Sequence, residues 1–289
     1  MVIGKQLPVY LVHWNAPEWV SSAAISILAS DIPVAVTVVD NGPASATAAM
    51  DLPSEVRIIS TGGNRGYAGG ANVALRDWLP TGADWCVIGA HDLHVESSDL
   101  RRMLTAAWVA PSFGILGPDT REHGGRSYYA GKHLGYSEGI EERSVMSGTC
   151  LLLRRSCILQ IGLLDEQFGS YGEDDELCHR ARRYGWKVGR VSGTRAHGLG
   201  TKASNRRELV VRNRVLLQIK LTGKRSAGIP VLGHYLKELT VLAMRGAMSA
   251  GFREEHRGRT KSTLSGLRRG FPMLWAELEP PPPAPLDTD

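Results

Sequence analysis

Residues 7–14, LPVYLVHW, form a short apolar run that ends at the polar residue Asn15, a pattern typical of a buried strand. A helical stretch follows at 17–29, and another lies near 68–78. Three further apolar runs alternate with these segments: VAVTVVDN (34–41), VRIIST (56–61) and DWCVIGA (84–90). This alternation of strand and helix predicts an α/β fold with a mostly parallel sheet flanked by helices.

The polar residues after each predicted strand are the first candidates for binding. Ligands of parallel sheets sit beyond the carboxyl ends of the strands. The residues at those ends are His13 to Asn15, Asp40 and Asn41, Gly62 to Arg65, and His91 to His94.

The pattern is less regular beyond residue 100. An apolar segment at 144–155 predicts a strand, residues 173–184 predict a helix and residues 187–193 predict another strand. From about 205 to 250 the chain is amphipathic with helical spacing, and its end is proline-rich and acidic. We therefore expect an α/β domain at 1–204, a basic amphipathic helical extension at 205–275 and a disordered tail at 276–289.

The composition excludes several classes of protein. The 289-residue chain is 43% apolar and 22% charged, unlike a disordered chain, a collagen or a short disulfide scaffold. No apolar run approaches the ~20 residues that cross a bilayer, and the first residues lack a signal-peptide pattern. The four cysteines form no CxxC pair, so we expect buried free thiols rather than a zinc site. These features predict a cytosolic protein.

Positive charge is concentrated late in the chain. Residues 200–275 hold 16 Lys and Arg against 4 Asp and Glu, whereas the whole chain has a net charge of +5. One interpretation is a helix packed on the main domain with a solvated basic face. The other is a surface that binds anionic lipid. Nucleic acid is disfavoured as a partner, because aromatic residues are not interleaved with the basic ones.

A glycine-rich segment, GGNRGYAGGAN (62–72), follows a predicted strand and opens a predicted helix. Glycines let backbone N–H groups approach a phosphate, and a helix N-terminus favours an anion. The spacing matches neither GxGxxG nor GxxxxGK[ST], which disfavours a dinucleotide-binding protein and a P-loop protein. A tight turn without a ligand is the alternative.

Asp92 and His94 lie two residues apart just after the fourth predicted strand. A carboxylate and an imidazole in this position could hold one divalent cation, with Mn²⁺ or Mg²⁺ the candidates. His197, just past a later predicted strand, is a candidate third ligand. The alternative is a solvated pair at the surface.

Four consecutive acids, Glu173 to Glu176, occupy one predicted helical turn. Their mutual repulsion costs stability unless a cation, the N–H groups of the helix end or a role in proton transfer offsets it. One of the four could act as a general base. An acidic N-terminal cap is the alternative.

Together these segments resemble the inverting nucleotide-sugar glycosyltransferases of the family-2 type, which have the GT-A fold. The likeness is to the bacterial rhamnosyl- and galactofuranosyltransferase-like branch, runs from about residue 7 to 215, and is most specific over 144–197. The segments that carry it are Val12–Asn15, Val38–Gly42, Asn64–Asn72, Gly148–Arg155, Ile161–Glu166, Glu173 and Asp174 with Leu177 and Arg180, His197, and Arg212–Arg214.

The resemblance implies roles for the matching positions. Asp174 is expected to be the catalytic base with Glu173 beside it, and Asp92 the acid that binds the metal. His197 is expected to help hold the metal or the diphosphate. Either His94 stands in for the second acid of the family pattern, or the metal is bound weakly and mostly through the diphosphate. The residues expected at the nucleotide are His13, Asn15, Asp40, Asn64, Arg65, Gly66, Gly70 and Gly148, with Asp40 at the base or ribose.

The resemblance also implies a reaction. A sugar moves from a nucleoside-diphosphate donor to a hydroxyl of a glycan or polyprenyl-pyrophosphate-linked acceptor, in the synthesis of a cell-envelope polysaccharide or glycolipid. A divalent cation, Mn²⁺ or Mg²⁺, supports the leaving diphosphate. The expected location is the cytoplasm, at the inner face of the plasma membrane if the basic extension binds lipid, and an oligomer is compatible with the sequence.

Two other functions stay open at this stage. The unusual HDLH at 91–94 favours a catalytically inactive relative that binds a nucleotide-sugar or a glycan, whereas the retained Glu173–Asp174 pair disfavours it. The missing GxGxxG disfavours a nicotinamide dehydrogenase.

Overall fold

The computed structural model describes residues 6–43, 49–122, 132–198 and 206–285. The chain forms two compact units. The first unit is Met1–Gly169, Glu173–Thr201 and Pro281–Asp289, and the second is Ser170–Gly172 and Lys202–Pro280.

One sheet, with ten strands among the described residues, forms the centre of the first unit. β1 (Leu7–His13) pairs in parallel with β2 (Val34–Asp40) on one side and with β4 (Trp85–Ala90) on the other. The order across the sheet is β3-β2-β1-β4-β9-β6-β10-β8-β7, and β5 pairs with β10. The other strands are β3 (Arg57–Ser60), β5 (Leu93–Val95), β6 (Phe113–Glu122), β7 (His133–Ser137), β8 (Ile140–Arg143), β9 (Cys150–Arg154) and β10 (Lys187–Gly198). The predicted α/β fold is confirmed, with parallel pairing in the centre from β3 through β2 and β1 to β4 and between β6 and β10. The pairings of β9, β5, β8 and β7 are antiparallel.

The central strands divide their side chains between two cores. Val9 and Leu11 of β1 lie in one core, whereas Tyr10 and Val12 lie in the other. Successive residues of a strand point to opposite faces, so a strand covered on both faces needs apolar residues at nearly every position. This explains the continuous apolar runs of the sequence.

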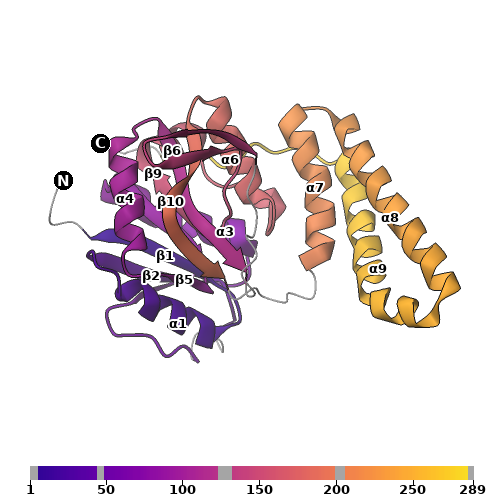
Figure 1. Cartoon of the computed structure of the whole chain (residues 1–289), viewed down its shortest axis with the longest axis horizontal. Helices are drawn as coiled ribbons and strands as arrows, with labels where there is room; N and C mark the ends of the chain where they lie inside the picture. The colour runs from indigo at the N-terminus through magenta and orange to yellow at the C-terminus, as the bar shows by residue number, and fades with distance from the viewer. Residues whose placement is uncertain (1–5, 44–48, 123–131, 199–205, 286–289) are drawn as a thin grey trace. The chain divides into compact units, whose positions relative to one another are not determined.

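Helices cover both faces of the sheet (Figure 1). The helices on the face of Val9 and Leu11 are α1 (Pro17–Leu28) and α4 (Asp99–Val109). The helices on the opposite face are α3 (Gly66–Trp78), α5 (Arg155–Ile161) and α6 (Glu173–Arg183). Short 3-10 helices lie at Leu79–Thr81, Glu166–Phe168, Arg225–Ala227 and Phe271–Leu274.

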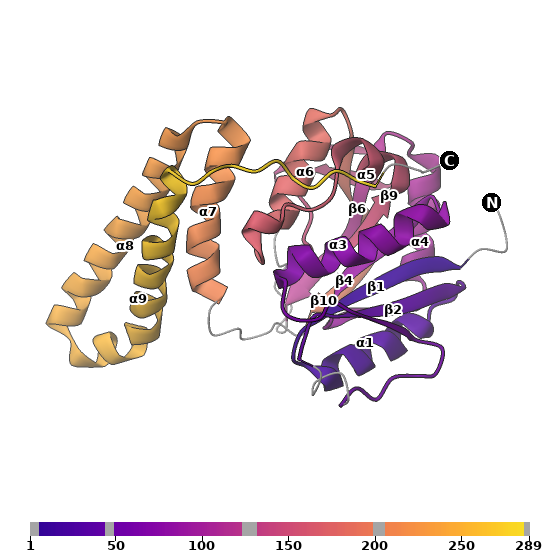
Figure 2. The same cartoon turned by 180° about the vertical axis from the view of Figure 1, so that it is seen from behind.

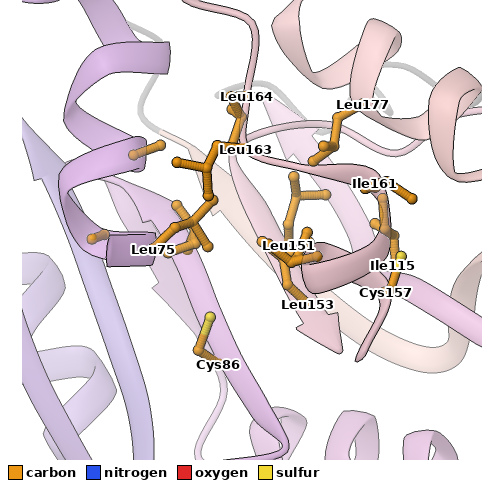
Figure 3. Close-up of a cluster of buried hydrophobic side chains, with 14 of the residues drawn as sticks. Leu75, Cys86, Ile115, Leu151, Leu153, Cys157, Ile161, Leu163, Leu164 and Leu177 are labelled. Atoms are coloured by element: carbon orange, nitrogen blue, oxygen red, sulfur yellow. The ribbon is translucent and has the colours of Figure 1, made fainter. Parts of the chain in front are cut away.

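The core beneath α3, α5 and α6 is shown in Figure 3. Leu75 of α3 and Leu177 of α6 share this cluster with Leu151 of β9. Cys86 and Cys157 belong to the same cluster, and all four cysteines of the chain are buried and unpaired, as the sequence predicts.

The predicted strand at 144–155 is shorter in the structure. β9 begins only at Cys150, and α5 begins at Arg155. Before β9, the hydroxyl of Ser147 accepts a hydrogen bond from the N–H of Thr149 and lies 3.0 Å from its hydroxyl. Such local bonds from serine and threonine compete with strand pairing and favour a turn.

The second unit contains α7 (Arg206–Thr222), α8 (Gly228–Met248) and α9 (Ala250–Gly270) (Figure 2). Val211, Val215 and Ile219 recur at four-residue spacing along α7 and pack in one core with Leu232 and Tyr235 of α8. The predicted C-terminal helical extension is confirmed. Within the described ranges, no helix combines the length and the apolar character needed to cross a membrane.

The tail packs where the sequence predicts disorder. The N–H of Leu163 donates to the carbonyl of Pro282 at 2.8 Å, and Ala284 is buried in the core of the first unit. Proline lacks an N–H but keeps a carbonyl that accepts a hydrogen bond, so a proline-rich segment can still bind a neighbouring backbone. The prediction of a disordered tail at 276–289 is therefore wrong for residues up to 285, and residues 286–289 lie outside the described ranges.

Candidate active site at the strand ends

A buried histidine and a buried aspartate lie at the ends of β1 and β2. His13 is opposite Asp40 in the parallel register, and its Nδ1 is 3.0 Å from Oδ1 of Asp40. Nε2 of His13 accepts from the N–H of Ala16, so the ring proton is on Nδ1 and is donated to Asp40. The N–H of Gly42 donates to the same carboxylate oxygen. The carboxylate of Asp40, which is expected at the base or ribose, is therefore buried and in contact with His13. Asn15 is exposed and has a left-handed backbone (φ 49°).

Asn41 connects the end of β2 to the glycine-rich segment. Its Nδ2 donates to the carbonyl of Gly66 at 2.8 Å, and its Oδ1 accepts from the N–H of Arg65 at 2.9 Å. Asn64 adds a local bond, because its Oδ1 accepts from the N–H of Gly66. The side chains of Asn64 and Arg65 are exposed at this end of the sheet, where the resemblance expects a nucleotide.

Gly70 has a packing role. A Cβ at this position would lie 2.7 Å from Cγ1 of Val12, so only glycine lets α3 approach β1 this closely. Gly70 is buried, and its expected contact with the nucleotide stays a prediction.

Asp174 lies in the first turn of α6 and is held by two backbone donors. Gly148 donates its N–H to Oδ2 at 2.7 Å, and Asp175 donates its N–H to Oδ1 at 2.9 Å. A Cβ on Gly148 would lie 3.2 Å from Oδ2, so a larger residue would crowd the carboxylate. The structure thus brings together Gly148 and Asp174, two residues that the sequence selected separately.

Glu173 is buried beside Asp174. Burial first, and then the negative charge of Asp174, raises the pKa of the Glu173 carboxyl well above its ordinary value. Its Oε2 has no hydrogen-bond partner among the residues that the structure describes. Burial and the neighbouring charge therefore favour the protonated form of Glu173.

Asp92 lies close to the end of β10. A Cβ on Gly198 would be 3.4 Å from Oδ2 of Asp92 and 3.4 Å from Cγ2 of Thr149. Asp92 and Asp174 are therefore both close to the turn at 147–149, Asp92 beside Thr149 and Asp174 on Gly148.

The two candidate histidine ligands differ in what surrounds them. His197 pairs with His94 in the antiparallel register of β10 and β5, and its side chain is exposed. Both ring nitrogens of His94 are engaged, Nδ1 with the carbonyl of Asp92 at 3.1 Å and Nε2 with the hydroxyl of Ser22 at 2.9 Å. These contacts disfavour His94 as a cation ligand, and its assignment stays a prediction. Within the described part of the chain, no three His, Cys, Asp or Glu side chains form a preformed metal cluster.

Similarity to known proteins agrees with these motifs. No protein-family model matches the chain. The chain is 30% identical over 222 residues to an N-acetylglucosaminyl-diphospho-decaprenol L-rhamnosyltransferase of Mycobacterium tuberculosis. This match covers 62% of the chain and 71% of the relative. The chain belongs to the family-2-type glycosyltransferases.

This glycosyltransferase is also 27% identical over 168 residues to the low-salt glycan biosynthesis hexosyltransferase Agl10 of Haloferax volcanii, with 53% of this chain and 54% of the relative covered. A solved mannosyltransferase of Pyrobaculum calidifontis, in complex with GDP-mannose and Mn²⁺, superposes with a TM-score of 0.58. That match covers 93% of this chain and 87% of the other at 14% identity, and it shows the GT-A fold.

The sequence motifs assign no role to two further residues of this glycosyltransferase, the buried His91 and the partly buried Tyr67. His91 accepts the N–H of Trp14 on Nδ1, and burial lowers its pKa. Tyr67 donates its hydroxyl to the carbonyl of Gly148 at 2.5 Å. Both lie within segments that the motifs marked. No spacing rule assigns a role to a tyrosine between glycines or to a histidine directly before Asp92.

Proposed function

We propose that this glycosyltransferase inverts the anomeric carbon as it moves a sugar from a nucleoside diphosphate to a hydroxyl of a glycan or polyprenyl-pyrophosphate-linked acceptor. The observation that carries the proposal is the turn at 147–149, which has Asp174 on Gly148 and Asp92 near Thr149. Transfer from a diphosphate requires a base for the acceptor and support for the leaving group, and the turn has one candidate for each. The name of the Mycobacterium tuberculosis relative, an N-acetylglucosaminyl-diphospho-decaprenol L-rhamnosyltransferase, supports the acceptor class.

Asp174 is the general base of the proposed reaction. Two N–H donors fix its carboxylate, and an ionised carboxylate has further lone pairs for the acceptor hydroxyl. Asp174 takes the hydroxyl proton while the hydroxyl oxygen forms its bond to the anomeric carbon. The bond from that carbon to the diphosphate breaks, and the nucleoside diphosphate leaves with the electron pair. The pKa of Glu173 is raised by burial and by the charge of Asp174, so its carboxyl is the less suited of the two acids to carry the negative charge of a base at this position.

Asp92 and His197 would hold a divalent cation, Mn²⁺ or Mg²⁺. Gly198 has no side chain beside the Asp92 carboxylate, which leaves space that a Cβ would fill. One carboxylate and one imidazole fit a cation that takes its remaining ligands from diphosphate oxygens and water. When bound, the cation offsets the charge on the leaving diphosphate. The Mn²⁺ in the Pyrobaculum calidifontis complex supports this part of the proposal.

The second unit is proposed to bind an anionic membrane surface at the cytoplasmic face. The one acid of α8, Glu238, is paired with Arg207 and Arg259, so α8 adds no unpaired negative charge. The exposed large apolar side chains of α8 are Ile229, Leu236, Val241, Met244 and Met248. Exposed apolar side chains together with an excess of basic residues are typical of helices that lie on anionic lipid.

Vesicle flotation tests this membrane proposal. The protein is expected to float with anionic vesicles at low salt and to be released at high salt. Leu236→Glu on α8 should weaken flotation, whereas the same change at Ile58 of β3, an exposed residue of the first unit, should not. An absence of flotation with anionic vesicles would leave the basic face as a solvated surface.

A catalytically inactive relative that binds a nucleotide-sugar or a glycan is the second candidate. It is favoured by the contacts of His94, which leave the HDLH segment with one acid and no second ligand.

A transfer assay separates the two candidates. The protein is incubated with labelled dTDP-, UDP- and GDP-sugars, Mn²⁺ and a polyprenyl-diphospho-N-acetylglucosamine acceptor. The enzyme proposal expects transfer from at least one donor, with the product of opposite anomeric configuration in its NMR spectrum. Binding of a nucleotide by thermal shift, with neither transfer nor donor hydrolysis in any combination, would instead establish the binding protein.

A further inference from the structure

Tyr67 lies at the second residue of α3, inside the glycine-rich segment. It is partly buried, and its ring packs against the core cluster that includes Leu75 and Leu177. Tyr67 has no part in the proposed transfer step. The hydroxyl of Tyr67 nevertheless contacts the turn at 147–149, which holds Asp174.

Two hydrogen bonds connect Tyr67 to Asp174 through a single residue. The hydroxyl of Tyr67 donates to the carbonyl of Gly148 at 2.5 Å, and the N–H of Gly148 donates to Oδ2 of Asp174 at 2.7 Å. Gly148 is thus bonded on both of its peptide groups. A glycine with one group free could rotate, whereas a glycine bonded on both keeps its N–H aimed at the carboxylate.

The contacts around Gly148 leave little room for another arrangement. A Cβ on Gly148 would lie 3.4 Å from Cβ of Asp174 and 3.5 Å from Cε1 of Tyr67. Burial, and then the negative charges of Glu173 and Asp174, raises the pKa of the Tyr67 phenol well above its ordinary value. The phenol therefore keeps its proton and stays a donor over the whole working pH range.

We propose that Tyr67 is a positioning residue for the general base, whose hydroxyl holds Asp174 through Gly148 in the orientation that receives the acceptor proton. This inference rests on the proposed role of Asp174. The glycine-rich segment then has a second function, because α3, which begins within this segment, carries the side chain that orients the base. Tyr67 touches neither the donor nor the acceptor in this role.

Tyr67→Phe is the test, because it keeps the ring and removes only the hydroxyl. We expect kcat to fall about 10–100-fold, as a small displacement of a reacting group does. Donor affinity, measured by calorimetry with the nucleoside diphosphate, should stay within about twofold. The calorimetric stoichiometry also counts the folded protein, so a loss of fold is not mistaken for a loss of turnover.

Tyr10→Phe is the matched control. Tyr10 belongs to the same core cluster, and its hydroxyl donates to Oδ2 of Asp77 at 2.7 Å, away from the turn at 147–149. Both variants lose one tyrosine hydrogen bond, at a similar cost of stability. Only Tyr67→Phe should lose kcat. An equal loss of kcat in Tyr10→Phe would mean that the effect is general destabilisation, and would overturn the inference.

A double-mutant cycle tests whether Tyr67 acts through Asp174. In the Asp174→Asn background, Tyr67→Phe should lower kcat by less than about twofold, because the carboxylate that Tyr67 positions is gone. A further tenfold loss in that background would overturn the inference, since Tyr67 would then act on its own. If Asp174→Asn turns over like the wild type, the proposed base is wrong. If Asp174→Asn is inactive and Tyr67→Phe is fully active, only the role of Tyr67 fails.

Discussion

Gly66 at the start of α3 is in backbone contact with Gly169, four residues before α6. A Cβ on Gly66 would lie 2.4 Å from the carbonyl oxygen of Gly169, and the N–H of Ala68 donates to that oxygen at 2.9 Å. The first turn of α3 is therefore closed against the segment that leads to the proposed base. The sequence marked Gly66 as a residue near the nucleotide, and the structure adds a packing role.

Gly66→Ala is expected to destabilise the protein more than Gly62→Ala. Both glycines have a left-handed backbone, with φ of 71° and 74°, which costs an alanine about 1–2 kcal/mol. Gly62 has nothing within 4 Å of an added Cβ, whereas Gly66 meets the backbone of Gly169. Overpacking should add about 1–3 kcal/mol at Gly66. Denaturant unfolding of the two variants measures the difference, and equal losses would contradict the contact.

Asp174→Asn is expected to lower kcat by about 10²–10⁴-fold, the usual contribution of a positioned base. The amide keeps the shape of the carboxylate but cannot take the acceptor proton, so donor affinity should be retained. Steady-state kinetics together with calorimetric binding of the nucleoside diphosphate measure the two effects. Asp175→Asn serves as the control, because it also replaces an aspartate by an asparagine in the first turn of α6 but leaves the carboxylate of Asp174 in place. Near-normal turnover of Asp174→Asn would remove it as the base.

Removal of divalent cations by EDTA is expected to abolish transfer, and Mn²⁺ or Mg²⁺ to restore it. Asp92→Asn should raise the Mn²⁺ concentration for half-maximal activity at least about tenfold, equivalent to ~1.4 kcal/mol of lost affinity. His94→Gln should leave this concentration unchanged, because both nitrogens of His94 are engaged elsewhere. Full activity in chelator would show that no cation takes part.

Glu173→Gln is expected to stabilise the protein in a pH-dependent way. The folded state holds the Glu173 proton to a higher pH than the unfolded state, whose glutamate loses it near pH ~4.3. Wild-type stability therefore falls as the pH rises from that value towards the raised pKa of the folded state. Gln keeps the side chain uncharged, so the variant should match the wild type near pH 4 and melt at a higher temperature near pH 7. A difference in melting temperature that is constant with pH would contradict this.

Arg180→Met is expected to destabilise the protein by about 3–5 kcal/mol, the cost of leaving one partner of a buried ion pair. Arg180 pairs with Glu176 at 2.7 Å, and the two side chains are only 11% and 10% exposed. Its guanidinium also donates to the carbonyls of Ile161 and Leu163. Chemical unfolding measures the loss. Arg180→Met combined with Glu176→Gln should recover part of it, and a loss below 1 kcal/mol for the single variant would refute a structural role.

The sequence predicted the parts of the fold that follow local rules. β1 and β4 are covered on both faces, so their apolar runs stand out, and Pro17 coincides with the observed start of α1. The prediction of a strand at 144–155 was wrong for the first half of the segment, because the Ser147 hydroxyl favours a turn there. The apolar residues around Ser147 give no sign of this turn in the sequence. Order in the tail was missed, because composition gives no sign that Pro282 meets the N–H of Leu163.

Local pattern by itself determined the α/β class, the order of strands and helices along the chain, and Asp92 and the four acids at 173–176 as residues to test, and the family resemblance selected Asp174 among the four. Only the tertiary structure decided the partners of these acids. The bond from Tyr67 to Gly148 joins residues 81 apart, and that from Gly148 to Asp174 joins residues 26 apart. Periodicity and spacing report on a few neighbouring residues, whereas such bonds depend on which distant segments the packing of α3 and α6 on the sheet brings together.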